Sequence, residues 1–235
     1  MPRDITAREI WKMCRKGCVY LDMTGISEEI IDKKLAELAD DCLTYLHKDI
    51  RKEPIPVCPG IHYFMGGILV DRKHRTQVRN LYAAGECCSQ YHGANRLGGN
   101  SLLGAIYGGK VAAETASKES AEKRDCFYEA QQLASEELSP NNKTQLNRIL
   151  LDALGVVRNE SSLQAAIEDI HQMKGSIPLL GQAVLKSAIA RRESRGAHFR
   201  EDFPCENDID FKKTTVARYD GSKIDITFET IPERR

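Results

Sequence analysis

Residues 92–103 read His-Gly-Ala-Asn-Arg-Leu-Gly-Gly-Asn-Ser-Leu-Leu, and this stretch decides how the middle of the chain folds. Its glycines allow the backbone to approach another group closely. The small residues that follow predict a helix packed tightly against a neighbour: Gly104, Ala105, Gly108, Gly109, Ala112 and Ala113. Unpaired N–H groups at the start of this helix suit a ligand region that carries negative charge. The alternative is a closely packed structural helix with an unusual cap.

The same helix contains a near match to a phosphate-binding loop, Gly104-x4-Gly109-Lys110-Val111. A true loop of this kind lies between a strand and a helix and ends in a Ser or Thr whose hydroxyl reaches Mg²⁺. Here Val111 stands at that position, and the glycines fall within a helical pattern. We therefore reject nucleoside triphosphate binding at this motif.

Two further segments place polar residues beside predicted strands. The run His62-Tyr-Phe-Met-Gly-Gly67 leads into an apolar stretch that predicts a strand at residues 67–71. A second strand is predicted at 80–84 and leads into Glu86. An acid at the carboxyl end of a buried strand is well placed to accept hydrogen bonds from ligand hydroxyls. Taken alone, His62 is equally compatible with simple packing, and Glu86 with capping a neighbouring helix.

The segment before residue 60 predicts an αβα unit. Helices are expected at 4–16 and 27–46, with a short β-prone run at 18–21 between them. Three prolines then impose an extended path and indicate a domain boundary: Pro54, Pro56 and Pro59.

The segment after residue 118 predicts a small helical bundle with a β-hairpin tail. Four amphipathic helices are expected, at 121–138, 141–158, 161–174 and 177–193. The tail then alternates polar and apolar residues on both sides of a turn at 219–222, which is typical of a hairpin.

Charge and cysteine content exclude several classes of protein. The chain of 235 residues carries 34 Lys and Arg against 34 Asp and Glu, so no net charge favours nucleic acid or an anionic membrane surface. No stretch approaches the roughly 20 apolar residues of a membrane span, and the first residues do not resemble a signal peptide. We expect a cytoplasmic protein. Its eight scattered cysteines predict free thiols, without a disulfide framework or a metal site.

Five segments in order resemble the flavoprotein family of succinate dehydrogenase, fumarate reductase and L-aspartate oxidase. They are PRDITAR (2–8), KEPIPVCPGIHYFMGGI (52–68), LYAAGE (81–86), HGANRLGGNSLL (92–103) and ESRGAHFREDFP (193–204). The resemblance implies an α+β, mostly α fold, with a partial capping domain at 1–59 and a partial FAD-domain sheet at 60–118. A helical bundle at 119–200 and a tail with a β-hairpin at 201–235 follow.

The resemblance also implies roles for individual residues. His62 and Arg96 would bind the carboxylates of a four-carbon dicarboxylate such as fumarate or succinate, and Arg3 would be the proton donor. Hydride would pass to or from flavin N5. Residues that would bind FAD or line its cleft are Glu86, Asn100, Ser101, Leu102, Leu103, Met65, Gly66 and Gly67. The charged cluster Arg195, His198, Arg200, Glu201 and Asp202 would join the bundle to the catalytic domain, although charged runs after a helix are usually solvated.

The sequence lacks one hallmark of that family, the GxGxxG turn that holds the FAD pyrophosphate. We therefore expect the chain to be incomplete and inactive alone. Its expected partners are an N-terminal flavoprotein half or an electron-transfer subunit, which would place it at the inner face of a membrane through other subunits. Two alternatives stay open: an L-aspartate oxidase fragment, and a noncatalytic assembly module.

Overall fold

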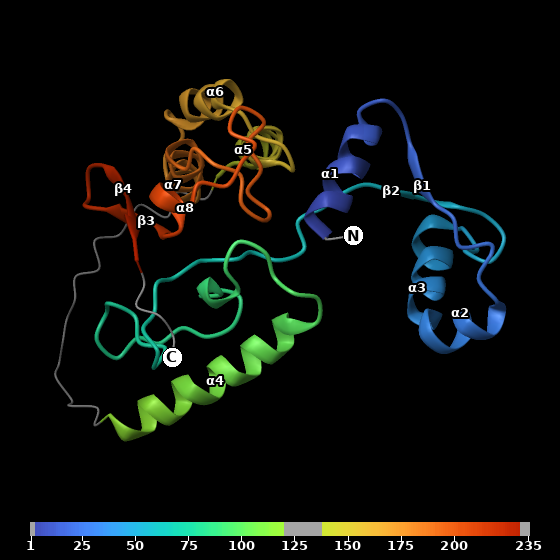
Figure 1. The fold of residues 1–235 in the computed structure, drawn as a ribbon, viewed down its shortest axis with the longest axis horizontal. Coiled ribbons are helices and arrows are strands. Elements are labelled where there is room, and N and C mark those ends of the chain that lie inside the picture. The colour runs from blue at the N-terminus through green and yellow to red at the C-terminus, as the bar shows by residue number, and fades with distance from the viewer. Residues whose placement is uncertain (1–2, 120–137, 231–235) are drawn as a thin grey trace. The chain divides into compact units, whose positions relative to one another are not determined.

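The computed structural model describes residues 3–119 and 138–230, and it divides the chain into two compact units (Figure 1). The first comprises residues 1–61 and the second residues 62–235. The regular elements of the described parts are helices and two small two-stranded sheets, so the fold is a mixed one with long irregular segments.

The first unit consists of short helices and one antiparallel strand pair. Its elements are α1 (Arg3–Cys14), β1 (Val19–Leu21), α2 (Glu28–Lys34), α3 (Ala36–Asp41), the π-helical turn η1 (Cys42–Leu46) and β2 (Ile55–Val57). In the pairing of β1 with β2, Val19 lies opposite Val57 and Leu21 opposite Ile55. The predicted helix at 27–46 is therefore interrupted, because Leu35 leaves helical geometry with φ −130° and separates α2 from α3.

The core of the first unit forms where those short helices meet β2. Its buried members are Met23, Ile31, Ala39, Cys42, Ile50 and Ile55. A π-helical turn ends at His47, whose φ of 55° reverses the chain toward the proline-rich segment. The prolines hold that segment extended, and β2 is its only regular part among the described residues.

The second unit begins with irregular chain that leads into η2 (Gln90–His92) and the long helix α4 (Asn100–Lys118). The predictions of strands at 67–71 and 80–84 are wrong, because neither segment forms a strand. Each region makes one isolated bridge, Gly67 with Cys88 and Tyr82 with Arg75. The reason is local, since Gly67 at φ 111° and Asn80 at φ 63° both leave the extended conformation that a strand ladder requires.

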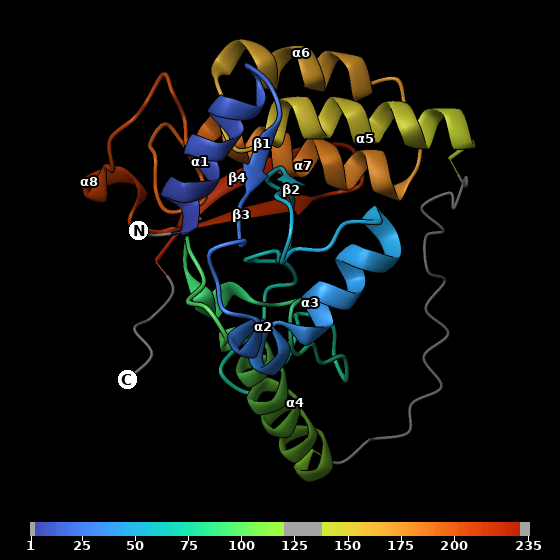
Figure 2. The same ribbon diagram turned by 90° about the vertical axis from the view of Figure 1, so that its right-hand side faces the viewer.

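Three helices of the second unit form a bundle, as the sequence predicts. They are α5 (Pro140–Leu154), α6 (Glu160–Ile170) and α7 (Ser176–Ala190), and they lie side by side (Figure 2). Ser139 and Asn159 cap α5 and α6 by accepting hydrogen bonds from Asn142 N and Ser162 N. The bundle core consists of Leu146, Ala153, Leu163, Ala166, Ile170, Leu185 and Ala188. The helix predicted at 121–138 falls on residues 120–137, outside the described part.

The predicted hairpin is confirmed. Strands β3 (Thr214–Tyr219) and β4 (Ile224–Glu229) pair in antiparallel register and contact α7, and a short helix α8 (Asp208–Phe211) precedes them. Asp220 fixes the turn, because its carboxylate accepts hydrogen bonds from Ser222 N and Lys223 N. In the part of the chain that the structure describes, no helix has the length and apolar character needed to cross a membrane.

Replacement of Leu185 tests the bundle core. Leu185 has no exposed surface on α7, whereas its neighbour Val184 is 46% exposed. We expect Leu185→Ala to lower the free energy of unfolding by about 2–5 kcal/mol, because it removes buried methyl groups and leaves a cavity. The matched change Val184→Ala is expected to stay within about 0.5 kcal/mol of the parent. Urea unfolding followed by circular dichroism measures both, and equal losses for the two variants would contradict this assignment.

Candidate active site

The candidate site forms where residues 62–67 lie against the loop 92–96. The Arg96 guanidinium carbon sits 4.6 Å from the centre of the Tyr63 ring, close enough for a cation–π contact. The Arg96 backbone N–H points to Met65 Sδ at 3.0 Å. His92 adds an edge-to-face contact with Tyr63, with ring centres 5.5 Å apart. The structure thus brings the His62 and Arg96 segments together, while the His62 side chain itself is exposed.

Three polar atoms in this cluster are buried without a hydrogen-bond partner: Tyr63 Oη, His92 Nε2 and Arg96 Nε. An unsatisfied buried polar atom costs about 1–3 kcal/mol, so a group of three calls for an explanation such as a ligand or water. Burial and the nearby charge of Arg96 lower the pKa of His92. The imidazole is therefore neutral at physiological pH and offers one donor and one acceptor.

Sequence reasoning assigned no role to Tyr63 or His92. Both stand inside the two motifs that were singled out, directly beside His62 and at the head of the 92–103 stretch. An aromatic residue next to a predicted ligand-binding histidine is weak evidence for a role in the site, because aromatic residues are common in protein cores. Only the fold shows that the two rings meet around Arg96.

Glycines let the 62–67 segment run beside the chain at 85–89. Gly67, with φ 111°, comes so close that a Cβ built on it would lie 2.2 Å from the Cys87 carbonyl oxygen. Ile68 N donates to that same carbonyl at 2.7 Å. The fully buried Ser89 hydroxyl accepts from Gly66 N at 3.2 Å and donates to the Phe64 carbonyl. The predicted site residues Gly66 and Gly67 thus have a backbone role as well.

Glu86 lies at the same junction, on an exposed turn. Its Oε1 accepts a hydrogen bond from Phe64 N at 2.8 Å, which ties the 85–89 chain to the 62–67 segment. A carboxylate has further acceptor capacity beyond one such bond. Glu86 therefore keeps acceptor capacity after it binds Phe64 N.

Helix α4 packs through its small residues on one side, as the sequence predicts. A Cβ on Gly104 would meet the Tyr91 ring at 2.9 Å, and one on Gly108 would meet the His74 ring at 2.8 Å. The helix begins after Gly99 at φ 82°, and no described side chain caps its first N–H groups. Large apolar side chains on α4 are nevertheless exposed by 64–68%: Leu102, Leu103, Ile106 and Tyr107.

Arg3 belongs to the first unit. It lines a cavity of about 270 Å³ together with Thr6, Ala7, Ile10, Val57, Cys58 and Pro59. Asp4, the nearest acid in the sequence, pairs with Arg8 at 3.4 Å. Among the described residues no carboxylate pairs with Arg3.

A turn at 195–198 fixes the loop that carries Arg96. Ala197 N donates to the Ala94 carbonyl at 2.9 Å. Gly196 has φ 56°, and a Cβ there would stand 2.4 Å from that carbonyl oxygen. Only glycine suits this close approach in a left-handed conformation. The hydrogen bond from Ala197 to Ala94 therefore connects the charged cluster to the loop that carries Arg96, in line with its predicted joining role.

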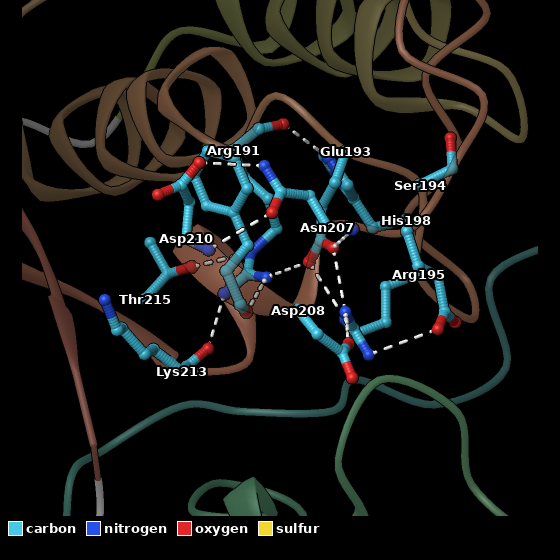
Figure 3. A network of polar contacts seen from close by, with 12 residues as sticks. Arg191, Glu193, Ser194, Arg195, His198, Asn207, Asp208, Asp210, Lys213 and Thr215 are labelled. Atoms are coloured by element: carbon cyan, nitrogen blue, oxygen red, sulfur yellow. Dashed lines mark hydrogen bonds and ion pairs between the residues drawn. The ribbon is translucent and has the colours of Figure 1, made fainter.

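Buried charges hold this turn in place (Figure 3). Glu193 has no exposed surface and accepts hydrogen bonds from Arg195 Nε at 2.9 Å, from Asn207 N at 2.9 Å and from Arg191. Burial raises the pKa of Glu193, but the donors from Arg195, Asn207 and Arg191 outweigh it and bring the pKa below its ordinary value. Figure 3 shows its carboxylate between the guanidinium groups of Arg191 and Arg195.

A second buried charge, Arg200, anchors the other end of the turn. It has no exposed surface and donates to Asp202 at 2.6 Å, to Glu160 at 2.7 Å and to the Ala188 carbonyl at 2.8 Å. The expectation that this charged run is solvated is wrong for Arg200, because paired carboxylates replace its water. Its burial connects α6, α7 and the turn.

Two family models match the sequence, that of the FAD binding domain over residues 1–102 and that of the fumarate reductase flavoprotein C-terminus over residues 175–234. The chain belongs to the succinate dehydrogenase and fumarate reductase flavoprotein family. Relatives of this flavoprotein chain include the L-aspartate oxidase of Pyrococcus furiosus, 34% identical over 93% of the chain and 46% of the relative. The succinate dehydrogenase flavoprotein subunit of Bacillus subtilis is 31% identical, with 93% and 46% covered.

Solved structures resemble the flavoprotein chain along its whole length. A variant of Escherichia coli quinol fumarate reductase superimposes with a TM-score of 0.81 at 27% identity, and the match covers 98% of this chain and 48% of that one. The Mycobacterium smegmatis Sdh1 complex in its apo form gives a TM-score of 0.74 at 27% identity, with 100% and 48% covered. The chain spans about half the length of the relatives it matches.

Paired glycine substitutions test the close approach at the site. Gly66 and Gly67 both have positive φ, at 126° and 111°, but only Gly67 has neighbours within reach of a Cβ. We expect Gly66→Ala to lower the free energy of unfolding by about 1 kcal/mol, from backbone strain alone. Gly67→Ala should cost about 2 kcal/mol more, because its Cβ collides with the Cys87 carbonyl. Chemical denaturation of both variants compares them, and equal losses would show that residues 67 and 87 are not in contact.

The buried His198 predicts a pH dependence of stability. Burial and the positive charge of Arg158 lower the pKa of His198 to about 4 from 6.5. Its Nδ1 faces Arg158 Nη1 at 2.6 Å and its Nε2 faces the Arg191 carbonyl at 3.2 Å. Between these two pKa values the unfolded chain binds the extra proton, so stability falls as pH decreases from about 6.5 toward 4. The loss is up to about 3 kcal/mol.

Unfolding free energies measured across that pH range check this prediction. We expect His198→Gln, whose amide has both a donor and an acceptor, to show a shallower decline than the parent. His171→Gln serves as the matched control at an exposed histidine and should keep the parent slope. A His198→Gln slope equal to the parent slope would contradict the assignment.

Proposed function

We propose that this chain forms the substrate-binding part of an FAD-dependent oxidoreductase that interconverts fumarate and succinate. The observation that carries the proposal is the cluster of Tyr63, His92 and Arg96, whose buried polar atoms lack partners beside the glycine-rich 62–67 segment. Family membership supports the same conclusion, since relatives include fumarate reductase and succinate dehydrogenase flavoprotein subunits.

Arg96 is the proposed carboxylate anchor. A guanidinium presents parallel N–H donors that match a carboxylate in a bidentate pair. The Tyr63 ring beneath it and the contact of its backbone with Met65 restrict how Arg96 can turn. Its Nη1 donates to the Leu97 carbonyl at 3.2 Å, which leaves Nε and Nη2 for a ligand.

His62 is the proposed second anchor. Its exposed ring precedes Tyr63 directly, so its backbone is fixed by the contacts of the Tyr63 ring with Arg96 and His92. Two anchors at the two ends of a four-carbon dicarboxylate hold its central bond in one orientation. Such positioning converts a bimolecular step into an effectively unimolecular one.

FAD is the proposed cofactor, and the residues present fit it. The uncapped start of α4 offers N–H groups at Ser101 and Leu102 to an electronegative ring edge, while Glu86 keeps acceptor capacity for ribitol hydroxyls. The exposed Leu102 and Leu103 provide apolar surface for a flat ring system. When bound, FAD supplies the chemistry of hydride exchange with the substrate.

Arg3 is the proposed proton donor. Arg3 is exposed and lines a cavity with mainly apolar neighbours, and no carboxylate pairs with it among the described residues. A guanidinium is strongly basic, so this role requires that the complete protein desolvate the exposed Arg3 and supply a group that restores its proton. The position of Arg3 in the segment PRDITAR (2–8), which matches the family motif, supports the proposal.

The proposed partner is a dinucleotide-binding half that contains the pyrophosphate clamp. The exposed apolar side chains along α4 support this, because a soluble protein normally covers a row of that kind. The chain spans about half of its relatives, which leaves room for such a half. We expect the chain by itself to bind FAD weakly and to show no turnover. An electron-transfer subunit is the second proposed partner, because the matched fumarate reductases are described as quinol enzymes.

L-aspartate oxidation is the second candidate function. It is favoured by the 34% identity to the Pyrococcus furiosus L-aspartate oxidase. The same anchors would hold aspartate, which is also a four-carbon dicarboxylate. Assays of the complete protein with succinate, fumarate and L-aspartate in parallel distinguish the two, and a protein that lacks flavin absorbance and acts on none of them would overturn both.

Substitutions at Tyr63 test how Arg96 is held in the complete protein. We expect Tyr63→Phe, which keeps the ring, to retain the parent KM for dicarboxylate within a few-fold. Tyr63→Leu removes the ring face, and a lost cation–π contact of about 1 kcal/mol should raise KM about five-fold. Arg96→Lys, which loses bidentate geometry, should lower kcat/KM by about 100-fold or more.

Flavin absorbance separates substrate binding from damage to the cofactor site. All three variants should keep the parent flavin spectrum, because neither side chain is assigned to FAD. Unchanged dicarboxylate kinetics in Arg96→Lys would contradict the proposed anchor. Equal KM values for Tyr63→Phe and Tyr63→Leu would show that the ring does not support Arg96.

A further inference from the structure

Two cysteines of the first unit, Cys18 and Cys58, directly flank the end of its strand pair. In the antiparallel register Val19 lies opposite Val57 and Tyr20 opposite Pro56. One further step in the same register places Cys18 opposite Cys58. Directly opposed residues of an antiparallel pair have Cα atoms about 4.5–5.5 Å apart and side chains on one face. A disulfide needs Cα atoms about 4.4–6.8 Å apart, so the backbone requires little movement to form one.

Both thiols are free and exposed. Cys14 is the nearest competitor, but it is partly buried and its Sγ points to the Val57 carbonyl at 3.6 Å. Within the described residues these cysteines do not gather into a group that could hold a metal ion. The pair is therefore set up for thiol chemistry between two accessible sulfurs.

We propose that Cys18 and Cys58 form a reversible disulfide when the chain meets a low-molecular-weight disulfide. One cysteine thiolate attacks a sulfur of the reagent RSSR, which forms a mixed disulfide and releases the first RSH. The second cysteine then attacks the protein sulfur and releases the second RSH. In sum, two protein thiols lose two electrons and two protons, and RSSR is reduced to two RSH. A dithiol reductant reverses the change.

The bridge has a consequence for the Arg3 cavity. Cys58 lines that cavity together with Arg3 and Val57. Formation of the disulfide draws Cys58 toward the end of β1 and closes a loop over residues 18–58, which contains the whole core of the first unit. The thiol state thus controls one wall of the cavity. Only the link to catalysis rests on the proposed role of Arg3, and the bridge itself does not.

Peptide mapping of the native chain tests the proposal without any activity assay. Trypsin places the three neighbouring thiols on separate peptides, with Cys14 on 13–15, Cys18 on 17–33 and Cys58 on 53–72. After incubation with oxidised glutathione we expect peptides 17–33 and 53–72 to be joined and to separate on reduction. We also expect the oxidised chain to melt at a higher temperature than the reduced chain, because the bridge restricts the unfolded state.

Serine variants identify the pair. Cys18→Ser and Cys58→Ser should each abolish the joined peptides and the rise in melting temperature, whereas Cys205→Ser, at an exposed thiol of the second unit, should change neither. Circular dichroism of the reduced variants checks that they are folded. The proposal is overturned if Cys18 and Cys58 end as separate glutathione adducts, or if the joined peptides contain Cys14. These outcomes are independent of whether the complete protein oxidises a dicarboxylate.

Discussion

The close contact between the 195–198 turn and the Ala94 carbonyl is the constraint on which the candidate site depends. It exists because Gly196 has no side chain and because two fully buried charges, Glu193 and Arg200, hold the chain on either side of it. Removal of these charges from water is costly, and the cost is offset only when every acceptor and donor is paired. The network is satisfied by donors from Arg191, Arg195 and Asn207 and by acceptors from Asp202 and Glu160.

This arrangement explains why a charged segment far along the sequence matters for Arg96. The loop with Arg96 has little regular structure of its own, and a short 3₁₀ turn and a helix start flank it. Contacts with other segments fix the position of this loop. Ala197 binds the Ala94 carbonyl on one side, and Tyr63 and Met65 contact Arg96 on the other. A loop held from two directions can keep a guanidinium in one orientation, which is what carboxylate recognition requires.

Two unfavourable features of the structure support the proposed function. Polar atoms of Tyr63, His92 and Arg96 are buried without partners, and the apolar side chains of α4 lie exposed nearby in sequence. Both features are unfavourable in an isolated chain. Buried polar groups lose free energy when they lack hydrogen-bond partners, and large exposed apolar side chains are usually covered by another part of the protein or by a partner. Under the proposed function, a bound substrate would pair the polar atoms and a flavin-binding half would cover the apolar side chains. The structural relatives, of which this chain spans about half, are consistent with that explanation.

The sequence by itself determined the helical bundle, the hairpin and the family, because 3.6-residue periodicity, turn residues and quoted motifs are local properties. It also located the segments of His62, Glu86 and Arg96. It failed at 67–71 and 80–84, where β-prone residues form no strand because Gly67 and Asn80 adopt positive φ and no ladder of neighbours forms. Only the tertiary structure decided that Tyr63 and His92 lie around Arg96, that Arg200 is buried, and that Cys18 and Cys58 flank the same end of the β1–β2 pair. Those facts depend on contacts between residues far apart in the chain, and neither composition nor spacing encodes which distant segments meet.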